Sequence, residues 1–207
     1  MQALASISLS PRISTKPAGD RECRDLLKRH LVASLIDPDT VVLDELGLCQ
    51  GDVRIDVAAV SGELAGFEIK SPADTLARWP KQCRFYSKVV DFAWLVATDK
   101  ALEKAKAPGW WGLIRIVQTK DQLGLRVIRP AVRNPKPDAY SIARLLWRDE
   151  AIATLDALGL ARGVRSKPRA KAWRRLATEA PLEHLRSAVR AALKVRANRI
   201  EELNDSH

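Results

Sequence analysis

Two opposite charges stand one residue apart in the stretch GFEIKS, residues 66 to 71, which otherwise has the pattern of a buried strand. Side chains alternate between the two faces of a strand, so Glu68 and Lys70 share one face and their apolar neighbours lie on the other. A surface ion pair on a half-exposed strand would explain this pattern and would contribute little to stability. A chemical site would explain it too, and the rest of the chain must decide between them.

Asp56 is another charge within an apolar strand pattern, VRIDVAAV at residues 53 to 60. A two-residue loop after this strand would pair Asp56 with Phe67 and mix charged with apolar faces. A three-residue loop, residues 61 to 63, pairs Asp56 with Glu68 and keeps the apolar positions together. Burial selects register strongly, because a slip of one residue turns every side chain over. We therefore expect the three-residue loop, which contains a glycine as odd hairpin loops often do.

This register sets the carboxylates of Asp56 and Glu68 opposite each other, with the ammonium group of Lys70 one step along the same face. Like charges directly opposite are destabilising in a sheet. A divalent cation between the carboxylates would compensate for their repulsion, and so would Lys70 alone in a structural cluster. The pairing by itself leaves both interpretations open.

The elements that would position these residues follow from periodicity and turn signals. The expected order is helix, three strands, helix and strand, followed by two more strands, a linker and helices. The expected ranges are helix 20–35, strands 41–46, 53–60 and 63–70, helix 80–90, strands 92–98, 112–118 and 124–129, linker 133–138, and helices 141–158 and 181–202.

Asp56, followed on the next strand by the tripeptide Glu68 to Lys70, resembles the PD-(D/E)XK nuclease signature. The order helix, three strands, helix, strand over residues 20 to 100 is similar to the core of that superfamily. The chain departs from the signature at Ile55, which stands where the motif has proline. The resemblance implies an α/β (α+β) fold with a restriction-endonuclease-like core, in which helices flank a mixed central sheet.

Gln82 and Tyr86 resemble the Q-x-x-x-Y motif of the RecB-like branch of these nucleases, and at i and i+4 they share one helix face. A polar helix face lying on the sheet is the competing structural interpretation. Similarity to a poorly characterised bacterial family within the superfamily extends over most of the chain. That similarity rests on the stretches EIKS, TLARWPKQCRFYSKVVD, GWWG and LLWRDEA.

The resemblance implies that Asp56, Glu68 and the backbone carbonyl of Ile69 hold Mg²⁺ or Mn²⁺, ions that favour oxygen ligands. It implies that Lys70 assists the attacking water and neutralises developing charge, and that Gln82 and Tyr86 position Lys70 or the nucleic-acid backbone. Glu45, in LDELGL, is a candidate further ligand through water, or else the mark of an exposed strand end.

Charge is concentrated in the C-terminal third of this 207-residue chain. Residues 131 to 207 hold 16 Lys and Arg against 9 Asp and Glu, within a total net charge of +10. Such an excess favours a polyanionic partner. Trp173 lies within the most basic stretch and would rest on a base or turn to the core. The candidate nucleic-acid contacts are Arg162, Arg165, Lys167, Arg169, Lys171, Arg174 and Arg175.

We expect a tail over residues 1–19, a nuclease-like core over 20–132 and a basic helical region over 133–207. The expected function is a metal-dependent nuclease acting on DNA, with RNA also compatible. A non-catalytic nucleic-acid-binding accessory protein and a structural protein with a basic surface are the alternatives. No apolar run has membrane-span length and no secretory pattern opens the chain, so we expect a cytoplasmic protein. The separated cysteines Cys23, Cys49 and Cys83 predict buried thiols rather than disulfides or a zinc site.

Overall fold

The protein is described by a computed structural model that covers residues 10–11, 19–34, 39–48, 50–71, 74–118 and 122–205. Its strands are β1 (Ser10–Pro11), β2 (Val41–Leu48), β3 (Val53–Val60), β4 (Leu64–Lys70), β5 (Phe92–Ala97), β6 (Gly112–Gln118) and β7 (Gln122–Arg129). They form one mixed open sheet in the order β1-β7-β6-β5-β4-β3-β2. β4, β5 and β6 run parallel to one another, and the other neighbours are antiparallel.

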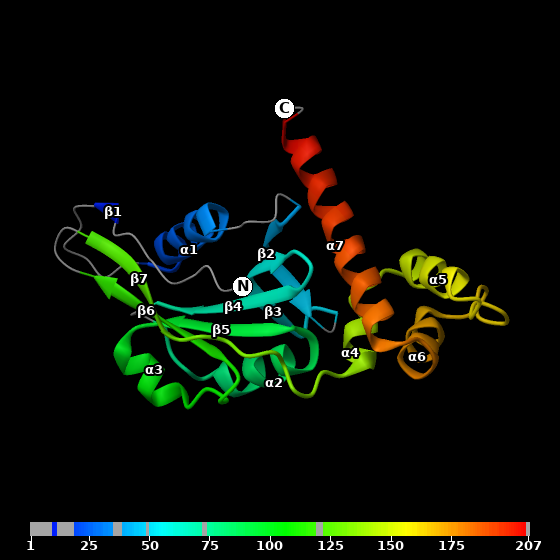
Figure 1. The fold of residues 1–207 in the computed structure, drawn as a ribbon, viewed down its shortest axis with the longest axis horizontal. Helices are drawn as coiled ribbons and strands as arrows, with labels where there is room; N and C mark the ends of the chain where they lie inside the picture. Colours follow the sequence, from blue (N-terminus) through cyan, green and yellow to red (C-terminus); the bar gives the residue numbers. More distant parts are fainter. Residues whose placement is uncertain are drawn as a thin grey trace.

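Helices cover both faces of the sheet, which gives the chain an α/β fold (Figure 1). α1 lies on one face, whereas α2 lies on the other face and is followed there by the C-terminal helices. No helix among the described residues is long and apolar enough to cross a membrane. The helices are α1 (Asp20–Ser34), α2 (Trp79–Val89), α3 (Asp99–Ala105), α4 (Ala139–Ala143), α5 (Arg148–Ala157), α6 (Arg169–Glu179) and α7 (Leu182–Asp205).

Two clusters of buried apolar side chains hold these layers together. On the α1 face, Cys23 and Leu27 pack with Phe67 of β4. On the other face, Tyr86 of α2 belongs to the same cluster as Leu193 of α7. The C-terminal helices are therefore packed on the core of the sheet through shared apolar burial, which is the main stabilising contribution to such contacts.

The expected strands from 41–46 to 124–129 and the helix expected over 80–90 are confirmed to within two residues at each end. The expected terminal helix is also confirmed and continues to Asp205. β5 is buried along nearly its whole length, as its continuous apolar run predicts. Three of the described elements were not expected: α3, α6, and the short β1, which lies in the predicted tail and pairs with β7. The rest of residues 1–18, together with Leu35 and Cys49, lies outside the described residues.

The single helix expected over 141–158 is wrong, because the chain turns between α4 and α5. The backbone N–H of Trp147 donates to the Glu150 carboxylate at 2.6 Å, which starts a new helix in the manner of a capping box. The carbonyl of Leu146 accepts from Trp173 Nε1 at 3.0 Å. Tertiary and capping partners thus satisfy the backbone at the break, and apolar periodicity does not show such partners.

Candidate active site

The β3–β4 hairpin has the register that the sequence predicts. Val60 pairs with Leu64 and Val57 pairs with Phe67, so the loop between the strands is the expected three residues, 61 to 63. The described ladder ends at the pair of Val57 and Phe67. Beyond it the strands are joined through side chains, and this is where the charged residues lie.

The alternation of side chains along β3 reverses at Asp56. Ile55 packs with Ala58 in the cluster beneath α2, whereas Val57 packs in the cluster beneath α1. Regular alternation along residues 53–60 predicts that Ile55 and Val57 share one face, and this prediction is wrong. The pairing of β2 with β3 also leaves out Glu45 and Asp56, and Glu45 has a φ of 53°. Both strands thus depart from regular geometry beside the candidate site.

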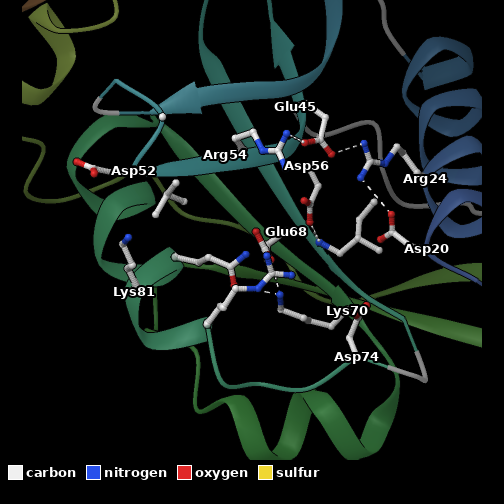
Figure 2. Close-up of a pocket in the computed structure, with 15 residues that line it drawn as sticks. Asp20, Arg24, Glu45, Asp52, Arg54, Asp56, Glu68, Lys70, Asp74 and Lys81 are labelled. Carbon is white, nitrogen blue, oxygen red and sulfur yellow. Dashed lines mark hydrogen bonds and ion pairs between the residues drawn. The ribbon is translucent and has the colours of Figure 1, made fainter.

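Asp56 does not pair with Glu68 in the ladder; its carboxylate bonds to the backbone of β4 instead. Oδ2 of Asp56 accepts the N–H of Ile69 at 2.8 Å. In the described part of the chain no hydrogen bond to Oδ1 of Asp56 is found, and Asp56 lines a cavity. Figure 2 shows the Asp56 carboxyl group turned toward β4 from above Glu68 and Lys70.

Glu68, Lys70, Gln82 and Tyr86 form one hydrogen-bonded set, and burial excludes water from most of it. Nζ of Lys70 donates to Glu68 Oε1 at 2.6 Å and to Gln82 Oε1 at 3.0 Å. The Tyr86 hydroxyl donates to Glu68 Oε2 at 2.8 Å. α2 therefore places the two side chains of its i, i+4 pair on the two charges of β4.

The Tyr86 hydroxyl also joins the two strands where their ladder stops. It accepts the N–H of Asp56 at 3.3 Å and lies 3.4 Å from the carbonyl oxygen of Phe67. One hydroxyl thus contacts the backbone of β3, the backbone of β4 and the Glu68 carboxylate. Its position fixes the geometry of both acidic residues at once.

Asp56, Glu68, Lys70 and Gln82 face a cavity of about 510 Å³ (Figure 2). Its walls come from α1, the β2–β3 hairpin, the end of β4 and the start of α2. Charged side chains of both signs line this cavity. Such a lining suits a charged ligand that binds together with ions or water. The lining residues are Asp20, Arg24, Glu45, Gly51, Asp52, Val53, Arg54, Asp56, Glu68, Ile69, Lys70, Asp74, Arg78, Lys81 and Gln82.

Burial makes ionisation of the acidic pair costly. Burial first, and then repulsion from Asp56, raises the pKa of Glu68 from 4.5 to about 7, although Lys70 and Tyr86 oppose the shift. Burial also raises the pKa of Asp56, against the N–H of Ile69 and the charge of Lys70. Burial and the Glu68 charge raise the pKa of Tyr86 well above 10, so its hydroxyl stays a donor.

Glu45 lies at the cavity wall, but its two carboxylate oxygens are held by arginines. Oε1 accepts from Arg24 at 2.8 Å, and Oε2 is 2.9 Å from a guanidinium nitrogen of Arg54 (Figure 2). Its charge is balanced without a cation. This arrangement does not favour the predicted role of Glu45 as a further metal ligand.

No group of three or more His, Cys, Asp or Glu side chains that could hold a metal ion occurs among the described residues. The donors that the site offers are the carboxylates of Asp56 and Glu68 and the carbonyl of Ile69. Mg²⁺ keeps several waters and needs only one or two protein carboxylates. The half-buried carboxylate of Asp56 and the buried carboxylate of Glu68 repel each other and therefore fit a divalent cation that completes its shell with water or substrate.

The seven predicted nucleic-acid contacts of the C-terminal region fall into two classes. Arg165 pairs with Asp156, and Arg175 pairs with Glu179 at 3.2 Å. Trp173 is buried, which confirms the interpretation that it turns to the core. The others have no carboxylate partner in the described part of the chain: Arg162, Lys167, Arg169, Lys171 and Arg174.

Several cavity residues were not predicted from the sequence. Arg24 comes from α1, Arg78 immediately precedes α2, and Lys81 lies in the first turn of α2. A sequence signal existed for Lys81, because it is next to Gln82 on the helix predicted over 80–90, whereas Arg78 lies before that range. No such signal existed for Arg24, which reaches the cavity through tertiary packing.

Three comparisons with known proteins add a family but no activity. A family model described as Bacteriophage P4 protein cII matches residues 20–204. A comparison with curated proteins found no match. Among solved structures, the SPO1766 protein of unknown function from Silicibacter pomeroyi is 22% identical, with 69% of this chain and 92% of that chain covered. Its TM-score of 0.39 is too low to support an argument about fold or function.

Proposed function

The chain belongs to the Bacteriophage P4 protein cII family, and we propose that it is a metal-dependent nuclease that hydrolyses phosphodiester bonds of DNA. The finer fold assignment, a PD-(D/E)XK restriction-endonuclease-like core, is part of this proposal. One observation carries it: Asp56, Glu68 and Lys70 face a single cavity, where Gln82 and Tyr86 of the next helix hold the charges of β4.

Asp56, Glu68 and the carbonyl of Ile69 would hold Mg²⁺ or Mn²⁺. Such a cation, when bound, lowers the pKa of a water molecule and stabilises the charge that develops on a phosphate. The support for this assignment is the donor set itself, because two carboxylates that repel each other line one cavity.

Lys70 would orient the attacking water and neutralise the developing negative charge, since its ammonium group is fixed and almost fully desolvated. Gln82 holds the Lys70 ammonium group and Tyr86 holds the Glu68 carboxylate. The two α2 side chains are positioning residues in this mechanism. They limit the freedom of the groups that act on the phosphate.

A second candidate function, a non-catalytic nucleic-acid-binding accessory protein, is favoured by the state of Glu45. Its arginine partners leave two of the three predicted carboxylate ligands, Asp56 and Glu68, for a cation. A protein that only binds nucleic acid would need the basic surface but not the two carboxylates of Asp56 and Glu68.

The test is cleavage of labelled linear, circular and branched DNA in Mg²⁺, Mn²⁺ or EDTA. Asp56→Asn and Glu68→Gln should each lower the rate at least about 100-fold, because each removes a charge that holds the cation. Asp52→Asn is the matched control. Asp52 lines the same cavity, but Figure 2 shows it on the β2–β3 loop, pointing away from Glu68.

Metal-dependent cutting that is lost in the two site variants and kept in the control would support the nuclease. Cutting that survives in both site variants would contradict it. If no substrate is cut in either metal but wild-type protein binds DNA with a steep dependence on salt, the accessory-protein function becomes the better account.

A further inference from the structure

One face of α2 carries a line of positive charge. Arg78 immediately precedes the helix, and Lys81, Arg84 and Lys88 follow at intervals of three or four residues, which places them along one side. All four are exposed. The opposite side of the helix is buried against the sheet through Trp79, Gln82, Tyr86 and Val89.

Nothing on the helix neutralises these cations. α2 has the sequence WPKQCRFYSKV, which contains no acidic residue. No carboxylate among the described residues forms an ion pair with Arg78, Lys81, Arg84 or Lys88. Like charges at these spacings destabilise a helix. Stability alone therefore gives no reason for the pattern, whereas a polyanionic ligand does.

A half-buried ring keeps the cations along this side of the helix. The centroid of Phe85 is 5.9 Å from Lys81 Nζ, 5.4 Å from Arg84 Cζ and 5.8 Å from Lys88 Nζ. Each contact is within the range of a cation–π interaction. The three side chains are thus gathered around one aromatic residue.

The line of charge begins at the candidate active site. Arg78 and Lys81 line the cavity that contains Glu68 and Lys70. From residue 78 to residue 88 the helix rises about 15 Å. One strand of a duplex advances about 3.4 Å per phosphate along its axis, so this distance corresponds to roughly four phosphates.

We propose that the exposed face of α2 is the surface on which the sugar–phosphate backbone of the nucleic acid lies as it reaches the cavity. This inference rests on the proposed function for its ligand. Arg78 and Lys81 contact the phosphates next to the cleaved bond, and Arg84 and Lys88 contact those further along. Because these contacts are with phosphate, they act on every sequence alike.

The test is equilibrium binding of a labelled 20-nucleotide duplex, and of one of its strands, in EDTA over a range of salt concentrations. The variant Arg84→Ala with Lys88→Ala removes two charges that lie outside the cavity. For the duplex we expect the slope of log affinity against log salt to fall by roughly 1.8, since each lost phosphate contact removes about 0.9. Affinity should fall to a similar extent for duplexes of unrelated sequence.

Lys100→Ala with Lys104→Ala is the matched control. These two lysines are exposed at i and i+4 on α3, and their loss changes the net charge by the same amount. The control should keep the wild-type slope, and both variants should keep the wild-type thermal unfolding midpoint. An unchanged slope in the α2 variant, or an equal change in both variants, would overturn the inference.

The binding test separates this inference from the proposed activity, because EDTA removes the divalent cations and binding is then measured without cleavage. If wild-type protein cuts DNA but the α2 variant binds as wild type does, the backbone surface is wrong and the nuclease stands. If nothing is cut but the α2 slope falls, the surface stands on a binding protein. If neither oligonucleotide binds to wild-type protein, the inference fails, and an acidic protein surface becomes the better occupant.

Discussion

Glu68 and Lys70 are charged residues within a sheet that buries both of them, with exposed fractions of 0% and 3%. A buried ion pair is a weak source of stability, because the desolvation of two charges offsets most of their attraction. An apolar pair of similar volume would stabilise the sheet at least as well. The presence of the pair, with Asp56 beside it, is therefore better explained by chemistry than by folding.

Glu68 makes the stability of the metal-free protein depend on pH. Its pKa is about 7 in the folded chain against an ordinary value of 4.5, so between these values the unfolded chain loses its proton and the folded chain keeps it. Folding stability should therefore fall as pH rises from about 4.5 to about 7, by up to about 3 kcal/mol. Urea unfolding in EDTA at pH 5, 6, 7 and 8 measures the effect.

Glu68→Gln supplies the control for this dependence, because its amide has no proton to lose in that range. The variant should show a flatter profile than wild type between pH 5 and 7. Saturating Mg²⁺ should raise wild-type stability more at pH 8 than at pH 5, because a cation needs the ionised carboxylate. Parallel profiles for wild type and variant would show that Glu68 titrates near its ordinary pKa in the folded chain.

The hydrogen-bonded part of the site could be predicted from the sequence because it depends on local periodicity. Strand alternation places Glu68 and Lys70 together, and helix periodicity places Gln82 and Tyr86 together. The arginine partners of Glu45 could not be predicted in this way. They come from different elements, and only tertiary packing brings these elements together.

At the scale of elements, the approach of α2 to β4 depends on Gly66. A Cβ atom at this position would lie 3.2 Å from the Tyr86 ring, 3.2 Å from Ile55 and 3.1 Å from Val90. Gly66→Ala should therefore force Tyr86, Ile55 and Val90 to shift by a few tenths of an ångström, which alters the position of the Tyr86 hydroxyl relative to Glu68. We expect a loss of about 1–3 kcal/mol in unfolding free energy, together with a fall in cleavage rate.

Gly62→Ala is the matched substitution in the β3–β4 loop, where a Cβ atom would meet nothing within 4 Å. Its stability should stay within about 0.5 kcal/mol of wild type, with an unchanged cleavage rate. Urea unfolding and initial cleavage rates compare the two variants. If Gly66→Ala lost stability but kept full activity, the spacing between α2 and β4 would not set the geometry of the site.

The elements themselves were largely predictable, whereas their irregularities were not. The hairpin register follows from the apolar pattern, because burial penalises any slip. The reversal at Asp56 was missed because alternation assumes regular pleating on both sides of the residue. The break at Trp147 was missed because the apolar period continues across it while capping interrupts the backbone.

For the whole molecule, Asp91 connects the sheet with the C-terminal helix. Its carboxylate accepts the N–H of Leu64 at 2.8 Å, and lies 3.2 Å from Arg186 and 3.6 Å from Arg190 of α7. Asp91 and Arg186 are both buried. Together with the shared apolar cluster, this contact fixes α7 on the layer that holds the site. α4 in turn contacts both α2 and α6, so the basic region is joined to the helix that borders the cavity.

The basic C-terminal region should separate binding from stability. Arg169 and Arg174 are exposed on α6 and have no carboxylate partner in the described chain, so Arg169→Glu with Arg174→Glu should weaken binding to DNA of every sequence. The slope of log affinity against log salt should fall by roughly 2.

Arg165→Gln with Arg175→Gln should instead leave that slope unchanged and cost up to about 2 kcal/mol of stability, because each arginine already has a carboxylate partner. Salt titrations and urea unfolding of both variants make the comparison. A slope altered only by the second pair would place the nucleic-acid contacts at Arg165 and Arg175 and not at Arg169 and Arg174.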